Sequence, residues 1–211
     1  LRWGLQGGSY QLVLQADLDG AAAGSAPDTS TSTSTSKGSR QASNKATGPL
    51  IDWQSQGATD AQGLAPLRYT SRRLGRGAQA VNFQPEAAVV SFSGSTAQQP
   101  LVPGGQDRLS WLMQLAGVMN AAPAQTREGS RTVLWVVGPR GDAEAWVFEL
   151  KERATLDLPD GRRVPALRLL REPTRLYDTQ AEVWLDPARD HLPLALRLSQ
   201  LGLSESLALR F

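Results

Sequence analysis

The sequence predicts a mainly β protein, in which one large, curled antiparallel sheet of about ten strands, half-barrel or barrel-like, packs around one α-helix. Short apolar segments recur at roughly ten-residue spacing, separated by turn residues and not by helical patterns. Only residues 106–120 carry a clear helical periodicity. The length of 211 residues suits a single β-rich domain over 1–211.

The first candidate strands flank a segment that is unsuited to folding. Residues 10–18 and 50–57 have strand composition, whereas residues 20–49 contain no Val, Ile, Leu, Met, Phe, Tyr or Trp. Such a segment buries too little apolar surface to offset the entropy of ordering it, so we expect it to be disordered. The simplest interpretation is a hairpin with a greatly expanded loop, which the slow growth of loop-closure entropy with length tolerates. A flexible tether or a modified loop is the alternative.

The remaining strands follow from turn residues and from alternation. Turn sequences stand at 75–77, 85–86, 138–141 and 159–162. Between them we expect strands at 67–74, 79–84, 88–93, 131–137, 143–151, 154–158, 164–171, 180–185, 192–200 and 204–211. The strand at 131–137 is apolar on both faces, so a second layer, a barrel interior or a ligand should cover its second face.

The helix over 106–120 interrupts this series of strands. A narrow apolar stripe should pack on the sheet, and it is formed by Leu109, Leu112, Met113, Ala116 and Met119. Trp111 and Gln114 lie on other faces of the helix. Asp107 would lie in the first turn, where a carboxylate interacts favourably with the helix dipole.

Composition and charge exclude several classes of protein. The longest apolar runs are far shorter than the ~18 residues that a membrane-spanning helix needs. A total of 22 Lys and Arg against 20 Asp and Glu is too balanced for a dedicated nucleic-acid binder. Cysteine is absent and His191 is the one histidine, which excludes thiol catalysis, disulfides and His/Cys metal sites. We expect no catalytic residues, cofactor or metal.

His191 is the one candidate for acid–base chemistry. It lies in a turn between two strands, where Asp186 or Asp190 could orient it as a general base. The alternative is a surface histidine in a charged turn, since no nucleophile motif accompanies it.

Aromatic and basic side chains suggest a ligand site. Six tryptophans are many beside four phenylalanines and three tyrosines, and tryptophan serves both cores and ligand cavities. The candidates for a cavity lining are Trp135, Trp146, Phe148 and Trp184. Arg68, Arg72 and Arg76 alternate along an extended segment and could contact a phosphate or carboxylate headgroup, or form an ordinary solvated strand face.

Four stretches resemble a known bacterial family, the domain of unknown function 3108, especially its proteobacterial branch. They are residues 63–69, 80–83 with 90–92, 103–110, and 183–186 with 192–194. The resemblance covers about Trp3 to Phe211, with no expected counterpart for the 20–49 insertion. It implies an exported, periplasmic or envelope-associated protein with a large antiparallel sheet curled around a helix. The family has no established activity, so the resemblance implies no catalytic residues.

The most recognisable family residues have purely structural explanations. Gln106 and Asp107 fit the start of a helix, with Ser110 bonding within the first turn. Pro193 fits a strand edge or a bulge.

These observations predict a non-enzymatic envelope protein that binds a hydrophobic or amphipathic ligand, such as a lipid or lipid-linked glycan, in the concave face of its sheet. The alternative is a structural or protein-interaction module of an envelope assembly, with the concavity filled by the protein's own helix; a hydrolase is a more distant one. Cysteine-free composition fits an oxidising compartment, but it fits a small cytosolic domain almost as well. The chain begins at Leu1 without an apolar leader, so a targeting segment would have been removed or would lie upstream.

Overall fold

The computed structural model describes residues 1–16, 49–158, 160–202 and 206–211. Its strands form two seven-stranded sheets, so the prediction of one sheet of about ten strands is wrong. The mainly β class and the α-helix, α1 (Ser110–Ala121), are confirmed, and the short 3₁₀ helix η1 (Pro123–Thr126) follows α1. The predicted insertion at 20–49 falls almost wholly outside the described residues.

Sheet A is an antiparallel meander in which each strand pairs with the next along the chain. The structure pairs the two strands that flank the predicted insertion, with Ala16 opposite Ile51. The first strand of the sheet was not predicted from the sequence. The strands of sheet A are β1 (Arg2–Gln6), β2 (Ser9–Ala16), β3 (Ile51–Asp60), β4 (Gly63–Arg73), β5 (Gln79–Gln84), β6 (Val89–Phe92) and β7 (Ser95–Pro100).

Sheet B is the curled half-barrel, and it is antiparallel except at one edge, where β8 pairs in parallel with β9. The segments predicted as separate strands at 143–151 and 154–158 form one long strand, because a bulge between Leu150 and Glu152 lets the pairing continue. In chain order its strands are β8 (Gln106–Asp107), β9 (Arg131–Val137), β10 (Ala143–Asp157), β11 (Arg163–Arg171), β12 (Thr179–Asp186), β13 (Leu192–Gln200) and β14 (Ser206–Arg210).

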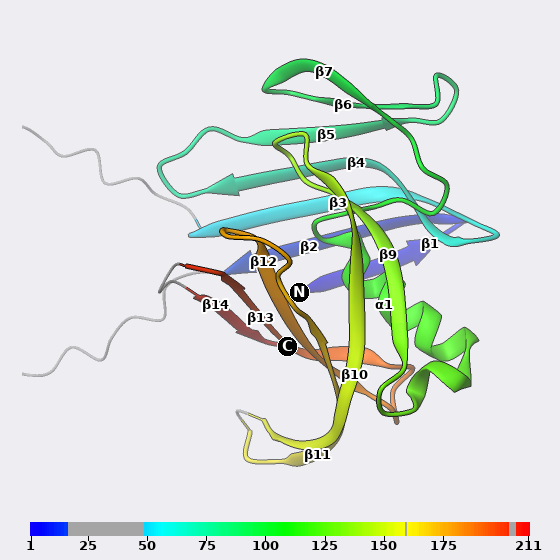
Figure 1. The fold of residues 1–211 in the computed structure, drawn as a ribbon, viewed down its shortest axis with the longest axis vertical. Coiled ribbons are helices and arrows are strands. Elements are labelled where there is room, and N and C mark those ends of the chain that lie inside the picture. The colour runs from blue at the N-terminus through cyan, green and yellow to red at the C-terminus, as the bar shows by residue number, and fades with distance from the viewer. Residues whose placement is uncertain (17–48, 159, 203–205) are drawn as a thin grey trace, which may run out of the picture.

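Helix α1 lies between the two sheets (Figure 1). Trp111, Leu112, Leu115 and Met119 join the core of sheet B, whereas Leu109 and Met113 join the core of sheet A. The buried surface of the helix is therefore wider than the predicted narrow apolar stripe, because a helix with a sheet on two sides buries most of its circumference. Trp111 is buried, although the sequence placed it on a face outside the apolar stripe.

The helix begins later than predicted, at Ser110, and its N-cap is Leu109, so the expectation that Asp107 lies in the first turn is wrong: Asp107 belongs to β8, just before the helix. Asp107 and Ser110 still bond each other and the backbone at the helix start. Asp107 Oδ1 accepts the backbone N–H groups of Leu109 and Ser110 at 2.7 and 2.8 Å. Ser110 Oγ in turn accepts the Asp107 N–H at 2.9 Å. These reciprocal bonds satisfy donors that a buried helix start would otherwise leave without partners.

Two glutamines attach this region to sheet A. Gln114 on α1 accepts the backbone N–H of Leu64 at 2.8 Å and donates to the carbonyl of Gln62 at 2.7 Å. Gln106 donates to the carbonyl of Leu64 at 2.8 Å and to that of Gly104 at 3.0 Å. The segment that leads from sheet A to sheet B is thus attached by Gln106 and Gln114, which bond backbone groups at the β3–β4 turn and at Gly104.

Candidate functional site

The concave face of sheet B, the predicted ligand cavity, is filled by the protein's own aromatic side chains. Trp146 and Phe148 are 1% and 0% exposed. The ring of Trp111 from α1 stacks on Phe148 with centroids 4.9 Å apart and lies 5.6 Å from Trp146. Two of the four predicted cavity residues therefore belong to the core beneath the helix.

The other two predicted cavity residues lie on the opposite face of sheet B. Trp135 pairs with Ala145, one position away from Trp146, and alternation places neighbouring residues on opposite faces. On β12, Trp184 lies 5.9 Å from the guanidinium of Arg197, which also bonds the buried carboxylate of Glu182 at 3.3 Å. The structure therefore does not bring the four aromatic residues together.

The apolar second face predicted for 131–137 stays partly open. Val133 on β9 and Val147 on β10 are paired and are 60% and 41% exposed. Among the described residues no second layer covers these two side chains.

The three predicted headgroup residues lie at an exposed part of sheet A. Arg68 donates to Asn82 at 3.0 Å, and Arg72 donates to Asp52 at 3.4 Å. Arg76 is exposed in the turn after β4. Arg68 and Arg72 alternate with buried Tyr69 and so point away from the core. Their contacts fit the solvated-face alternative.

An apolar groove does exist, but at another place: between β1, α1 and the start of β13. We call it the β1–β13 groove, and its volume is about 240 Å³. Trp3 forms one side and stacks on the buried Tyr10, with centroids 5.8 Å apart. The groove is lined by Leu1, Trp3, Met113, Asp186, Arg189, Leu192, Pro193, Leu194 and Phe211.

A bulge in sheet B shapes the far side of this groove. Trp184 pairs with Ala195 while Leu185 pairs with Pro193, so Leu194 is the extra residue. Bulges re-aim side chains, and here Leu194 lines the groove. The backbone carbonyl of Leu194 accepts the N–H of Phe211, which holds that aromatic residue beside it. The bulge lies next to Pro193, for which a strand edge or a bulge was expected.

The polar rim of the groove is a turn attached to the end of α1. Asn120 donates to the Asp190 carbonyl at 2.6 Å, and its carbonyl oxygen lies 2.7 Å from His191 Nδ1. Burial lowers the pKa of His191, and the nearby carboxylates of Asp190 and Asp186 only partly offset this. The group next to Nδ1 is the Asn120 amide, and not the carboxylate of Asp186 or Asp190 that was expected to orient this ring. These contacts give His191 a structural role in holding the turn.

Two charged groups stand at this rim. Asp186 is 6% exposed and accepts the backbone N–H of Ala188 at 2.9 Å. Arg189 is exposed and forms no ion pair with any described residue. The groove thus combines apolar walls with a rim that carries one carboxylate and one arginine.

A second depression, of about 350 Å³, lies at the β5–β6 turn. It is formed by Leu67 and residues 84–87, which are exposed and offer few large apolar side chains. The β1–β13 groove is the better candidate, because more of its lining consists of large apolar groups.

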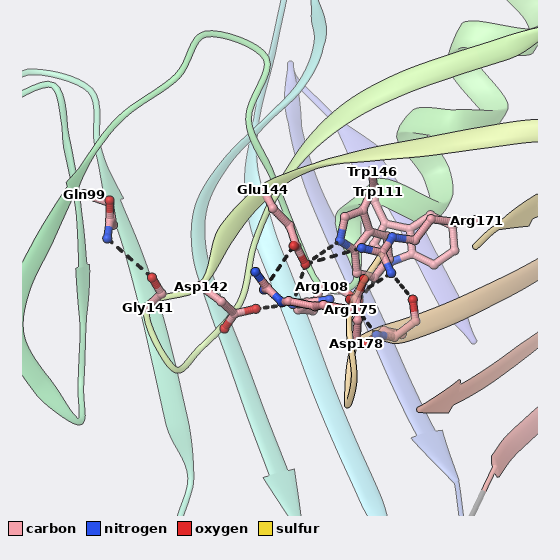
Figure 2. Close-up of polar contacts among 11 residues, drawn as sticks. Gln99, Arg108, Trp111, Gly141, Asp142, Glu144, Trp146, Arg171, Arg175 and Asp178 are labelled. Atoms are coloured by element: carbon pink, nitrogen blue, oxygen red, sulfur yellow. Dashed lines mark hydrogen bonds and ion pairs between the residues drawn. The ribbon is translucent and has the colours of Figure 1, made fainter. Parts of the chain in front are cut away.

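An ion-pair cluster lies around Trp146 and is the most concentrated set of charges among the described residues (Figure 2). The guanidinium groups of Arg108 and Arg171 lie 4.6 and 4.7 Å from the Trp146 ring centroid. Arg171 bonds Asp178 at 2.9 Å and lies 3.5 Å from Glu144. Further contacts join Arg108 to Asp142 and Arg175 to Glu144.

This cluster is electrically balanced and internally paired. Burial alone would raise the pKa of Asp178, but hydrogen bonds from Arg171 and the Thr174 backbone outweigh it and lower the pKa. Each arginine has a carboxylate partner, so no charge is left for a ligand. The cluster fastens strands of sheet B over the aromatic core.

The fold and this groove define a two-sheet β protein with a small amphipathic surface site. The chain matches a family model described as "Protein of unknown function (DUF3108)" over residues 24–201, which is 178 of its 211 residues. It therefore belongs to the DUF3108 family. The match begins within the serine- and threonine-rich segment, for which no counterpart was expected, and it stops before β14.

No curated protein and no solved structure matches the chain. Among the described residues no helix is long and apolar enough to cross a membrane. That part of the chain also holds no group of three or more His, Cys, Asp or Glu side chains that could bind a metal ion.

Proposed function

We propose that this chain is a non-enzymatic protein that binds the apolar part of an amphipathic ligand in the β1–β13 groove. The supporting observation is the combination of Trp3, Met113, Phe211 and other apolar side chains around one opening, with Arg189 at its rim. Burying apolar ligand surface against them is favourable by ~25 cal/mol per Å².

The size of the groove limits what it holds. Its volume of about 240 Å³ falls below the ~300–1,000 Å³ of pockets that enclose a drug-sized ligand. An aromatic ring system or a short stretch of acyl chain would fit, with the polar part of the ligand in solvent near Arg189. A long acyl chain would extend beyond the described groove.

Direct titration with 1-anilinonaphthalene-8-sulfonate tests this proposal, because the dye combines apolar rings with an anionic group. We expect saturable 1:1 binding with a rise in dye fluorescence. Trp3→Glu should weaken binding by roughly tenfold or more, since it places a charge in the apolar wall. Arg189→Gln should weaken it by a few-fold.

The matched control is Val133→Glu, which adds the same charge to an exposed apolar site on sheet B. It should leave dye binding unchanged. Unsaturable binding by the unmodified protein, or equal affinity of the Trp3→Glu variant, would exclude the groove as the site.

A structural module of an envelope assembly is the second candidate function. The observation that favours it is the filled concave face of sheet B, where Trp111 occupies the space beside Phe148. An envelope location is part of both proposals and rests on the family resemblance. Fractionation of the native host, with detection of the protein in periplasm and membranes, tests the location.

A further inference from the structure

Strand β1 forms an open edge of sheet A. It pairs with β2, and no other described strand pairs with it. All five of its residues are exposed. The exposure of Gly4 is informative, because a glycine has no side chain and its backbone is therefore what solvent reaches. An open strand edge of this kind is a template for pairing with another chain.

The other sheet edges carry features that discourage pairing. Strand β7 has polar side chains and ends at Pro100, and β8 has only two residues. On β14, the Arg210 side chain bonds the Asp157 carbonyl. By contrast, β1 presents Trp3 and Leu5, which are 37% and 57% exposed. Its one charged residue, Arg2, donates to Gln15 on β2.

The hairpin turn fixes which backbone groups of β1 point outward. Gly7 and Gly8 both have positive φ, +57° and +76°, as a two-residue hairpin turn requires. Such a turn closes on a hydrogen-bonded pair, here Gln6 with Ser9. Hydrogen-bonded and non-hydrogen-bonded pairs alternate along an antiparallel ladder. The N–H and C=O groups of Trp3 and Leu5 therefore point to the open edge.

We propose that a second copy of this chain pairs with β1, antiparallel, across a two-fold axis that passes beside Gly4. In this register Trp3 of each copy forms a hydrogen-bonded pair with Leu5 of the other, which gives about four backbone hydrogen bonds. Gly4 faces its own equivalent. The two copies of sheet A become one continuous sheet.

Side-chain chemistry makes the strand self-complementary in this register. Trp3 and Leu5 share one face, so each apolar side chain meets an apolar one across the axis. On the other face Arg2 meets Gln6, and no like charges oppose each other. A Cβ on Gly4 would have no atom within 4 Å, so a cysteine side chain fits at this position.

The lack of cysteine in the chain allows a direct test of the register. Facing residues of a non-hydrogen-bonded pair have Cα atoms ~4.5 Å apart, within the range of a disulfide. Gly4→Cys should therefore cross-link two copies rapidly under mild oxidation. Arg2→Cys is the matched control on the same exposed face. Its two sulfurs would belong to residues about 14 Å apart, beyond disulfide reach.

Sedimentation over a concentration series up to about 1 mM tests the association without a cysteine. The unmodified chain should show a reversible monomer–dimer equilibrium. Leu5→Pro removes an outward N–H but no bond to β2, so it should raise the dissociation constant at least tenfold and preserve dye binding. Val133→Lys, at another exposed apolar site, should leave the equilibrium unchanged.

A monomer throughout the series would overturn the proposal. So would a dimer in which Gly4→Cys cross-links no faster than Arg2→Cys, since that would place the contact elsewhere. Dimer formation unchanged by Leu5→Pro would exclude β1 as the contact.

Discussion

Replacing Arg171 with methionine is expected to lower the free energy of unfolding by about 3–5 kcal/mol. The side chains of Arg171 and Asp178 are 2% and 3% exposed, and they are bonded at 2.9 Å. Methionine retains packing against Trp146 but leaves the Asp178 carboxylate buried without its cation. Removing one partner of a buried ion pair is far more costly than replacing both. Urea denaturation followed by tryptophan fluorescence measures the change.

The control for this variant lies in the same cluster. Arg175 also bonds Glu144, at 3.2 Å, but its side chain is 66% exposed. Arg175→Met should therefore change stability by less than about 1 kcal/mol. If Arg171→Met changed stability no more than Arg175→Met, the cluster would not fasten sheet B as described.

Replacing Asp107 with alanine is the second large effect we expect, a loss of about 3–5 kcal/mol. The Asp107 carboxylate is fully buried and accepts the Ser55 hydroxyl at 2.5 Å as well as two backbone N–H groups of the helix start. Alanine removes the acceptor for all of these buried donors. Each unsatisfied donor costs ~1–3 kcal/mol. Thermal and urea denaturation measure the loss.

The carboxyl group of Asp107 also makes the free energy of unfolding depend on pH, with higher stability at lower pH. Burial raises the pKa of Asp107 to about 6, although hydrogen bonds from Ser55 and the helix start oppose the shift. In the unfolded chain its pKa is ~3.9, so between these values the folded state binds more protons. The proton-linked part of the stability, which is separate from the hydrogen bonds lost in the alanine variant, is therefore full below pH ~4 and is lost as pH rises through about 6.

The comparison variant is Asp107→Asn, which has no titrating group. The stability of the wild-type protein relative to this variant should rise by up to about 3 kcal/mol between pH 7 and pH 4. Burial, and then the negative charge of Asp107, raise the pKa of Tyr10. Tyr10 therefore does not titrate between pH 4 and pH 7. A relative stability that is flat, or falls toward pH 4, would contradict the raised pKa.

Sequence patterns specified the local elements of this fold better than their assembly. The strands at 79–84, 131–137 and 192–200 match β5, β9 and β13 residue for residue, because turn residues or breaks in alternation mark both ends. Pairing is a tertiary property. Nothing local indicates that the parallel pairing of Gln106 with Val136 begins a second sheet.

The sequence likewise did not predict which side chains meet at the candidate site. Trp135 and Trp146 are close in sequence, but β9 and β10 direct them to opposite faces of sheet B. The actual groove joins Trp3, Met113 and Phe211, which are remote in sequence. One local signal was available: apolar residues 1, 3 and 5 alternate before the Gly7–Gly8 turn, as in a hairpin strand.

Native mass spectrometry of the protein purified from a bacterial periplasm, followed by solvent extraction, tests the central claim most directly. We expect an additional mass of small amphipathic size on the wild-type protein and on Val133→Glu. That mass should be absent from Trp3→Glu, and the extract identifies its chemical class. A folded wild-type protein with no additional mass, or the same mass on Trp3→Glu, would contradict a ligand-binding role for the β1–β13 groove.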